Sequence, residues 1–141
     1  MANLTTKGVS VLDLRCESNL GTAVTGTDEK TICKFVLVSN NHELYLIFGS
    51  VREFPYHANL LDCFCDRYQI PAGWIKDPDM VEIYDPDFAI KGGGWMEIDK
   101  SARSLQIYGY STAYGRFDPK DLDLVLRDDP LFSTYSVKIG A

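Results

Sequence analysis

The segment Tyr108–Gly115 reads YGYSTAYG and decides how the second half of this chain folds. Its two glycines bracket a serine and an alanine, with aromatic residues between them. Because glycine tolerates positive φ and close backbone approach, such a stretch is typical of a turn that aims several backbone N–H groups at one point. A strand-like run, Ser104–Ile107, precedes it, and three glycines, Gly92–Gly94, lie further upstream. The pattern predicts a strand that runs into an anion-binding turn.

Strand-like runs are spread along the whole chain. They are apolar, β-branched or alternating stretches bounded by turn residues: Val9–Leu14, Ile32–Val38, Glu43–Phe48, Met80–Tyr84, Trp95–Ile98, Leu105–Tyr110 and Ser133–Ile139. The turn residues at 40–41 and the polar segment 99–103 predict that two pairs of these runs form hairpins. We expect one mixed β-sheet of about six strands.

Two segments carry the signature of a helix. Phe54–Tyr68 has Pro55 near its start, where the missing N–H costs little, and an apolar stripe at helical spacing. A second helix should start near Asp118, which can cap it, with Pro119 at its first position. The expected fold class is therefore α/β, in the α+β arrangement, with one mixed sheet flanked by two helices.

Length and charge limit the classes of protein to consider. The chain has 141 residues, 45% of them hydrophobic, which suits one globular domain. We expect residues 1–30 to form an N-terminal extension with a short strand, and residues 31–141 to form the main domain. The net charge of −6 argues against a nucleic acid or an anionic membrane as a partner, because both favour clustered Lys and Arg.

The cysteines and the N-terminus indicate a cytoplasmic protein, which we expect to be a monomer. Cys16, Cys33, Cys63 and Cys65 form no C-x-x-C pair, so reduced thiols are favoured over disulfides or a zinc site. The first residues lack the basic and apolar regions of a secretory signal, and no apolar run has transmembrane length. The acidic residues near 118–123 belong to a helix start, so no metal or other cofactor is expected.

His57 is the main candidate for acid–base chemistry. The chain has two histidines, and His42 follows a turn, where we expect it to be solvated. His57 lies at the start of a predicted helix, where the helix dipole disfavours the imidazolium and keeps a neutral base available at pH 7. The alternative is a partly buried, hydrogen-bonded histidine at the edge of the apolar stripe, and spacing alone favours that alternative.

Four blocks of sequence resemble the Janus/Ocnus family. They are KFVLV at 34–38, YHA at 56–58, GGG at 92–94 and YGYSTAYG at 108–115, in the family's order and at similar spacing. The resemblance runs from about residue 33 to near the C-terminus. It implies a cofactor-independent hydrolase that cleaves the P–N bond of phosphohistidine in proteins or peptides.

The resemblance also implies roles for single residues. His57 would be the catalytic residue, as a base on water or as a transient phosphoryl acceptor. Ser111, Thr112 and Ala113 would hold the phosphoryl group, and Lys34 would help. The alternatives are a turn whose glycines serve geometry only and an ordinary solvent-facing strand lysine.

Two departures from the family leave a second class of function open. The family has arginines straight after its triple glycine and before the glycine that precedes the histidine block, where this chain has Trp95 and Phe48. Arg52 is the candidate replacement for a lost guanidinium, the stronger clamp for phosphate. The competing class is therefore a non-catalytic phosphate- or phosphoprotein-binding module, and a third is a purely structural domain.

Overall fold

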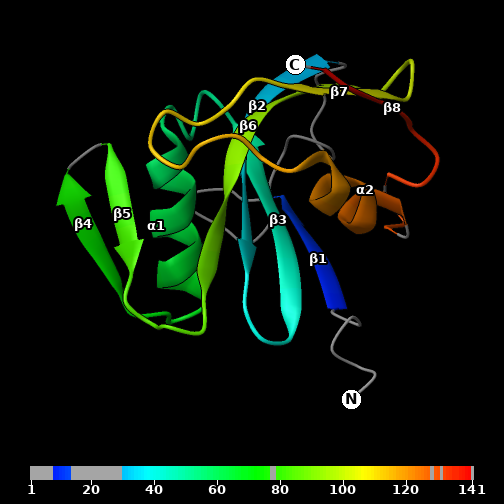
Figure 1. Ribbon diagram of the computed structural model, residues 1–141. Helices are drawn as coiled ribbons and strands as arrows, with labels where there is room; N and C mark the ends of the chain where they lie inside the picture. The colour runs from blue at the N-terminus through cyan, green and yellow to red at the C-terminus, as the bar shows by residue number, and fades with distance from the viewer. Residues whose placement is uncertain (1–7, 14–29, 77–78, 128, 131, 141) are drawn as a thin grey trace.

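The computed structural model describes residues 8–13, 30–76, 79–127, 129–130 and 132–140. Six strands form one mixed sheet in the order β1-β3-β2-β6-β7-β8, and β4 and β5 form a separate hairpin (Figure 1). The elements in chain order are β1 (Gly8–Asp13), β2 (Lys30–Ser39), β3 (Glu43–Ser50), α1 (His57–Arg67), β4 (Ala72–Lys76), β5 (Met80–Ile83), β6 (Ala89–Asp99), β7 (Ser104–Tyr108), α2 (Pro119–Arg127) and β8 (Ser136–Ile139). The expected α+β class is confirmed.

The middle of the large sheet is antiparallel and its two edges are parallel. β2 pairs antiparallel with both β3 and β6, and β6 pairs antiparallel with β7. At the edges, β1 lies parallel to β3 and β8 lies parallel to β7. The two expected hairpins, β2–β3 and β6–β7, are confirmed.

Each face of the large sheet is covered by one helix. Phe35 and Leu37 of β2 are buried in a cluster with the inner face of α2, whereas Val36 and Val38 are buried in a second cluster with α1. Figure 1 shows α1 and the β4–β5 hairpin on one side of the sheet and α2 on the other. Because side chains alternate along a strand, the even-numbered residues of β2 share the α1 side, and Lys34 is one of them.

The first helix is shorter than predicted. The sequence predicts a start at Phe54, but α1 begins at His57, and its N-cap residue Tyr56 is extended with φ −124° and ψ 148°. A residue before proline disfavours helical dihedrals, so Phe54 cannot easily join a helix that contains Pro55. Asn59 Oδ1 accepts a hydrogen bond from the Tyr56 N–H at 2.9 Å and fixes the entry to the helix. His57 is consequently the first helical residue.

Several strands differ from their predictions; one is β7, which covers Ser104–Tyr108 where Leu105–Tyr110 is predicted. β4 was not predicted, because residues 70–73 carry strong helix-stop signals that hide the strand after them. β6 starts at Ala89 and includes the triple glycine, which propensity disfavours in a strand. β8 is shorter than the predicted run Ser133–Ile139. Cys16 and most of the expected N-terminal extension lie outside the described residues.

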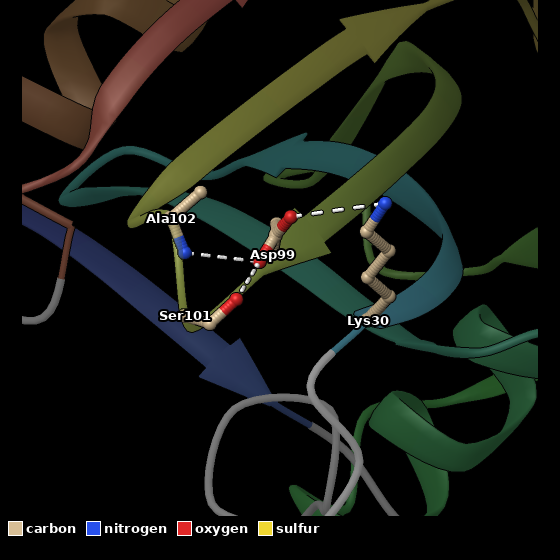
Figure 2. Close-up of polar contacts among 4 residues, drawn as sticks. All are labelled: Lys30, Asp99, Ser101 and Ala102. Atoms are coloured by element: carbon tan, nitrogen blue, oxygen red, sulfur yellow. Dashed lines mark hydrogen bonds and ion pairs between the residues drawn. The ribbon is translucent and has the colours of Figure 1, made fainter.

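Asp99 stabilises the turn between β6 and β7. Its Oδ1 accepts hydrogen bonds from Ser101 Oγ at 2.9 Å and from the Ala102 N–H at 3.0 Å, and its Oδ2 lies 3.9 Å from Lys30 Nζ (Figure 2). The pKa of this carboxyl is lowered, chiefly by the hydrogen bond from Ala102 and next by the one from Ser101. This turn connects β7 to β6, the strand that carries the triple glycine.

Candidate active site

A cavity of about 590 Å³ brings most of the predicted site residues together. Its wall is built from β2, the start of α1, β6, the loop after β7 and the β4–β5 hairpin. The lining residues are Lys34, Tyr56, His57, Ile75, Lys76, Asp79, Met80, Trp95, Tyr110, Ser111, Thr112 and Ala113. Five of the six predicted site residues are in this set, and Arg52 is not.

His57 is buried and has a defined tautomer. Its side chain is 8% exposed, and Nε2 lies 2.9 Å from the carbonyl oxygen of Gly94. A carbonyl oxygen only accepts hydrogen bonds, so we assign the proton to Nε2, which donates. In the neutral ring, Nδ1 is then the basic nitrogen.

The surroundings of His57 keep its imidazole neutral. Burial is the largest effect and lowers the pKa of His57; the bond to Gly94 opposes this, and the nearby Lys34 ammonium lowers the pKa further. The position of His57 at the first residue of α1 acts in the same direction, because the helix dipole disfavours a cation there. The ring is therefore available as a base at neutral pH.

The triple glycine makes room for the histidine ring. A β-carbon on Gly93 would lie 2.5 Å from the Phe35 carbonyl oxygen and 3.1 Å from His57 Cδ2. Gly94 supplies the oxygen that His57 binds. Gly92 has φ +99°, and a β-carbon there would meet the Arg116 backbone at 2.5 Å. Because they lack side chains, the three glycines allow β6, the loop after β7 and His57 to pack closely.

The loop after β7 folds on its own backbone and leaves two N–H groups unused. Ser111 and Gly115 exchange N–H···O bonds of 3.1 and 2.8 Å, and Ser111 Oγ accepts from the Tyr114 N–H at 3.1 Å. Among the described residues, the N–H groups of Thr112 and Ala113 have no partner. Ser111, 1% exposed, shapes the turn, and Thr112 and Ala113 offer the donors for an anion.

Lys34 lies between two aromatic rings at the cavity wall. It is directly opposite Trp95 on the neighbouring strand, and its Nζ lies 4.9 Å from the Trp95 ring centroid and 5.7 Å from that of Tyr56. The same Nζ donates a hydrogen bond to the Pro55 carbonyl oxygen. Partial burial lowers the pKa of Lys34. Such contacts hold a cation in place, so Lys34 is oriented rather than freely solvated.

Tyr114 joins the loop to the β4–β5 hairpin, a contact that sequence reasoning does not predict. Its hydroxyl accepts from the Val81 N–H at 2.7 Å and donates to the Val81 carbonyl oxygen at 2.9 Å. The hairpin supplies Ile75 and Met80 to the cavity wall. Had Ala72–Lys76 been recognised as a strand that pairs with the predicted strand near Met80, this wall of the cavity would have been predictable.

The two arginine departures have different consequences in the structure. Phe48 is fully buried and packs against Phe132 in the α2-side cluster, on the face of the sheet opposite to Lys34. Arg52 is exposed in the turn after β3, where its N–H bonds Ser50 Oγ at 3.2 Å, and does not line the cavity. Trp95 is therefore the departure that bears on the cavity.

Cys65 of α1 does not line the cavity. Burial, with a smaller effect of Asp62, raises the pKa of the Cys65 thiol to about 11, so this cysteine is no thiolate at neutral pH. Within the described ranges, no three His, Cys, Asp or Glu side chains are grouped to hold a metal ion.

Comparison with known proteins defines the family. The model of the Janus/Ocnus family (Ocnus) matches residues 23–135, so this chain belongs to the Janus/Ocnus family. A search of curated proteins found no match. Within the described part of the chain, neither helix has the length and apolar character needed to cross a membrane.

Proposed function

We propose that this protein hydrolyses the phosphoramidate P–N bond of phosphohistidine in proteins or peptides, with His57 as the base and without a cofactor. One observation carries the proposal: His57, whose basic nitrogen is Nδ1, lines the same cavity as two unused backbone N–H groups and an oriented lysine. A base, an anion nest and a cation in one cavity are the parts that hydrolysis of a phosphoryl compound needs.

In the proposed reaction, His57 Nδ1 accepts a proton from water as the water oxygen attacks phosphorus. An O–P bond forms and the P–N bond breaks. The leaving imidazole nitrogen takes a proton, which the His57 imidazolium can return, and the products are inorganic phosphate and histidine. A second route, in which Nδ1 attacks phosphorus and is then released by water, uses the same groups.

Three donors would hold the phosphoryl oxygens. The N–H groups of Thr112 and Ala113 point from a turn fixed by the Ser111–Gly115 pair. Lys34 carries three N–H donors and uses one on the Pro55 carbonyl oxygen. These groups would stabilise the charge that develops on the phosphoryl oxygens without metal assistance.

A non-catalytic phosphate- or phosphoprotein-binding module is the second candidate, and the indole of Trp95 favours it. Of the described residues that line the cavity, Lys34 and Lys76 are the cations, and Lys76 Nζ lies 3.8 Å from Asp79 Oδ2. With an indole in place of a guanidinium, the charge available for transition-state stabilisation is small. Binding could then survive without turnover.

Phosphoramidate hydrolysis separates the two candidates. Purified wild-type protein, His57→Ala and His42→Ala are compared at pH 7.5, with folding checked by circular dichroism. Because His42 is exposed and outside the cavity, His42→Ala is the matched control. The enzyme proposal expects turnover by wild type and His42→Ala and loss of about a hundredfold or more in His57→Ala. Absence of turnover in wild type, with phosphate still bound, would support the binding module instead.

A further inference from the structure

Several large apolar side chains that line the cavity are exposed to solvent. Tyr56, Ile75 and Tyr110 are 44%, 58% and 62% exposed, and all three line it. They come from three different segments: the N-cap of α1, strand β4 and the loop after β7. Exposed apolar groups that converge on one cavity mark a binding surface, whereas scattered ones need no explanation.

The cavity is larger than the chemistry requires. About 590 Å³ lies within the range of roughly 300–1,000 Å³ that holds drug-sized ligands. A phosphorylated imidazole that reaches His57 and the Thr112 and Ala113 N–H groups leaves much of this space unfilled. The β4–β5 hairpin contributes Ile75, Lys76, Asp79 and Met80 to the remaining wall, and the other residues there are Tyr56, Trp95 and Tyr110.

We propose that Ile75, Met80 and Tyr110 bind a large apolar side chain next to the phosphohistidine of a substrate peptide. The inference rests on the proposed function and names its substrate class: peptides in which leucine, methionine or a similar residue flanks the phosphorylated histidine. Ile75 and Tyr110 are then specificity-determining residues.

The charges along the cavity favour an apolar neighbour over an acidic one. An acidic flanking residue would need a cation beside Ile75 and Met80, where Lys76 Nζ lies 3.8 Å from Asp79 Oδ2. Lys34 lies near His57, with its Nζ on the Pro55 carbonyl oxygen. The net charge of −6 also disfavours acidic peptides. The apolar residues of the lining and the charges near them both favour an apolar residue next to the phosphohistidine.

Two histidine-phosphorylated peptides of equal length and charge test the inference. One has leucine on both sides of the phosphohistidine and the other has serine. kcat/KM is measured for wild type, Ile75→Ser, Tyr110→Ser and Leu124→Ser. Leu124 is 42% exposed on α2 and does not line the cavity, so Leu124→Ser controls for loss of a surface apolar group.

We expect wild type and Leu124→Ser to prefer the leucine peptide by about tenfold or more, as apolar pockets do. Ile75→Ser and Tyr110→Ser should each reduce this preference severalfold. Equal kcat/KM for both peptides in wild type, or a preference that neither variant reduces, would overturn the inference.

Phosphoramidate, which has no flanking residues, tests the proposed function separately. If wild type hydrolyses it but does not distinguish the peptides, the inference fails and the function stands. If nothing is hydrolysed, the dissociation constants of the two peptides decide: a tenfold preference for leucine that Ile75→Ser reduces supports the apolar subsite, and equal constants contradict it.

Discussion

The imidazole Nε2 of His57 lies 2.9 Å from the carbonyl oxygen of Gly94, and this contact decides which nitrogen can act as a base. Nδ1 is left with its lone pair, because the carbonyl requires the proton on Nε2. Gly93, the residue before Gly94, has no side chain and so lets the strand approach the ring. A β-carbon at this position would lie 3.1 Å from His57 Cδ2. The histidine and the triple glycine are thus one structural unit.

The pKa of His57 should lie below the ordinary value of about 6.5. Burial disfavours the imidazolium, and Lys34 adds repulsion. In ¹H–¹⁵N NMR, the His57 midpoint of the folded protein should fall below that of the same residue in urea. Lys34→Met should move the midpoint upward by removing the repulsion. A folded-state midpoint at or above the urea value would show that the ring is not kept neutral.

The same shift gives folding stability a pH dependence. Because the unfolded chain binds a proton at His57 more readily than the folded protein, the free energy of unfolding should decrease as pH falls below about 6.5. The loss should level off once the folded protein is protonated too. Urea unfolding between pH 5 and 8, with His57→Gln as the comparison, measures it; an equal pH dependence in both proteins would contradict this account.

Tyr114→Phe should lower the free energy of unfolding by about 1–3 kcal/mol. The hydroxyl that bonds both the N–H and the carbonyl oxygen of Val81 would be lost, so both backbone groups would lose their partner. Tyr110→Phe is the matched control, since its hydroxyl makes no hydrogen bond to any described residue, and it should stay within about 0.5 kcal/mol of wild type. Equal urea midpoints for the two variants would show that the Tyr114 contact does not tie loop to hairpin.

Trp95→Arg should tighten the binding of inorganic phosphate about tenfold. Trp95 lines the cavity opposite Lys34, and a guanidinium there would add a charged hydrogen bond worth roughly 1.5–3 kcal/mol. Calorimetric titration at fixed ionic strength measures the change. Leu124→Arg adds the same charge outside the cavity, and its affinity should match that of wild type. If both variants gain equally, net charge rather than position 95 is responsible.

Sequence reasoning predicted the elements with clear periodicity and missed those that depend on distant contacts. In the run Ile32–Val38, residues 35–38 alternate between two buried faces, and the run was recognisable as a strand. β4 was not predictable, because the strand has only five residues, is partly exposed and is stabilised by pairing with β5. The glycines of β6 have low strand propensity and belong there because His57 packs against one of them.

The candidate site was predictable in its chemical residues and not in its walls. His57, Lys34 and the Ser111–Ala113 turn lie within quoted blocks of sequence, and the cavity contains all of them. Arg52 was expected from chain proximity alone, and the turn after β3 leaves it outside the lining. Ile75 lies outside every quoted block, and Tyr110 lies inside YGYSTAYG without a role that the motif reveals, because a wall built from three segments appears only when the chain is folded.

Whether a phosphoryl group binds between the loop and the histidine is the central question, and a phosphate titration followed by ¹H–¹⁵N NMR tests it most directly. The account predicts saturable shifts of the Thr112 and Ala113 amides and of His57 Nδ1, with one dissociation constant for all three. The amides of α2, on the opposite face of the sheet, should not move. Saturable shifts confined to other residues, or none at Thr112 and Ala113 up to the highest phosphate concentration, would contradict the account.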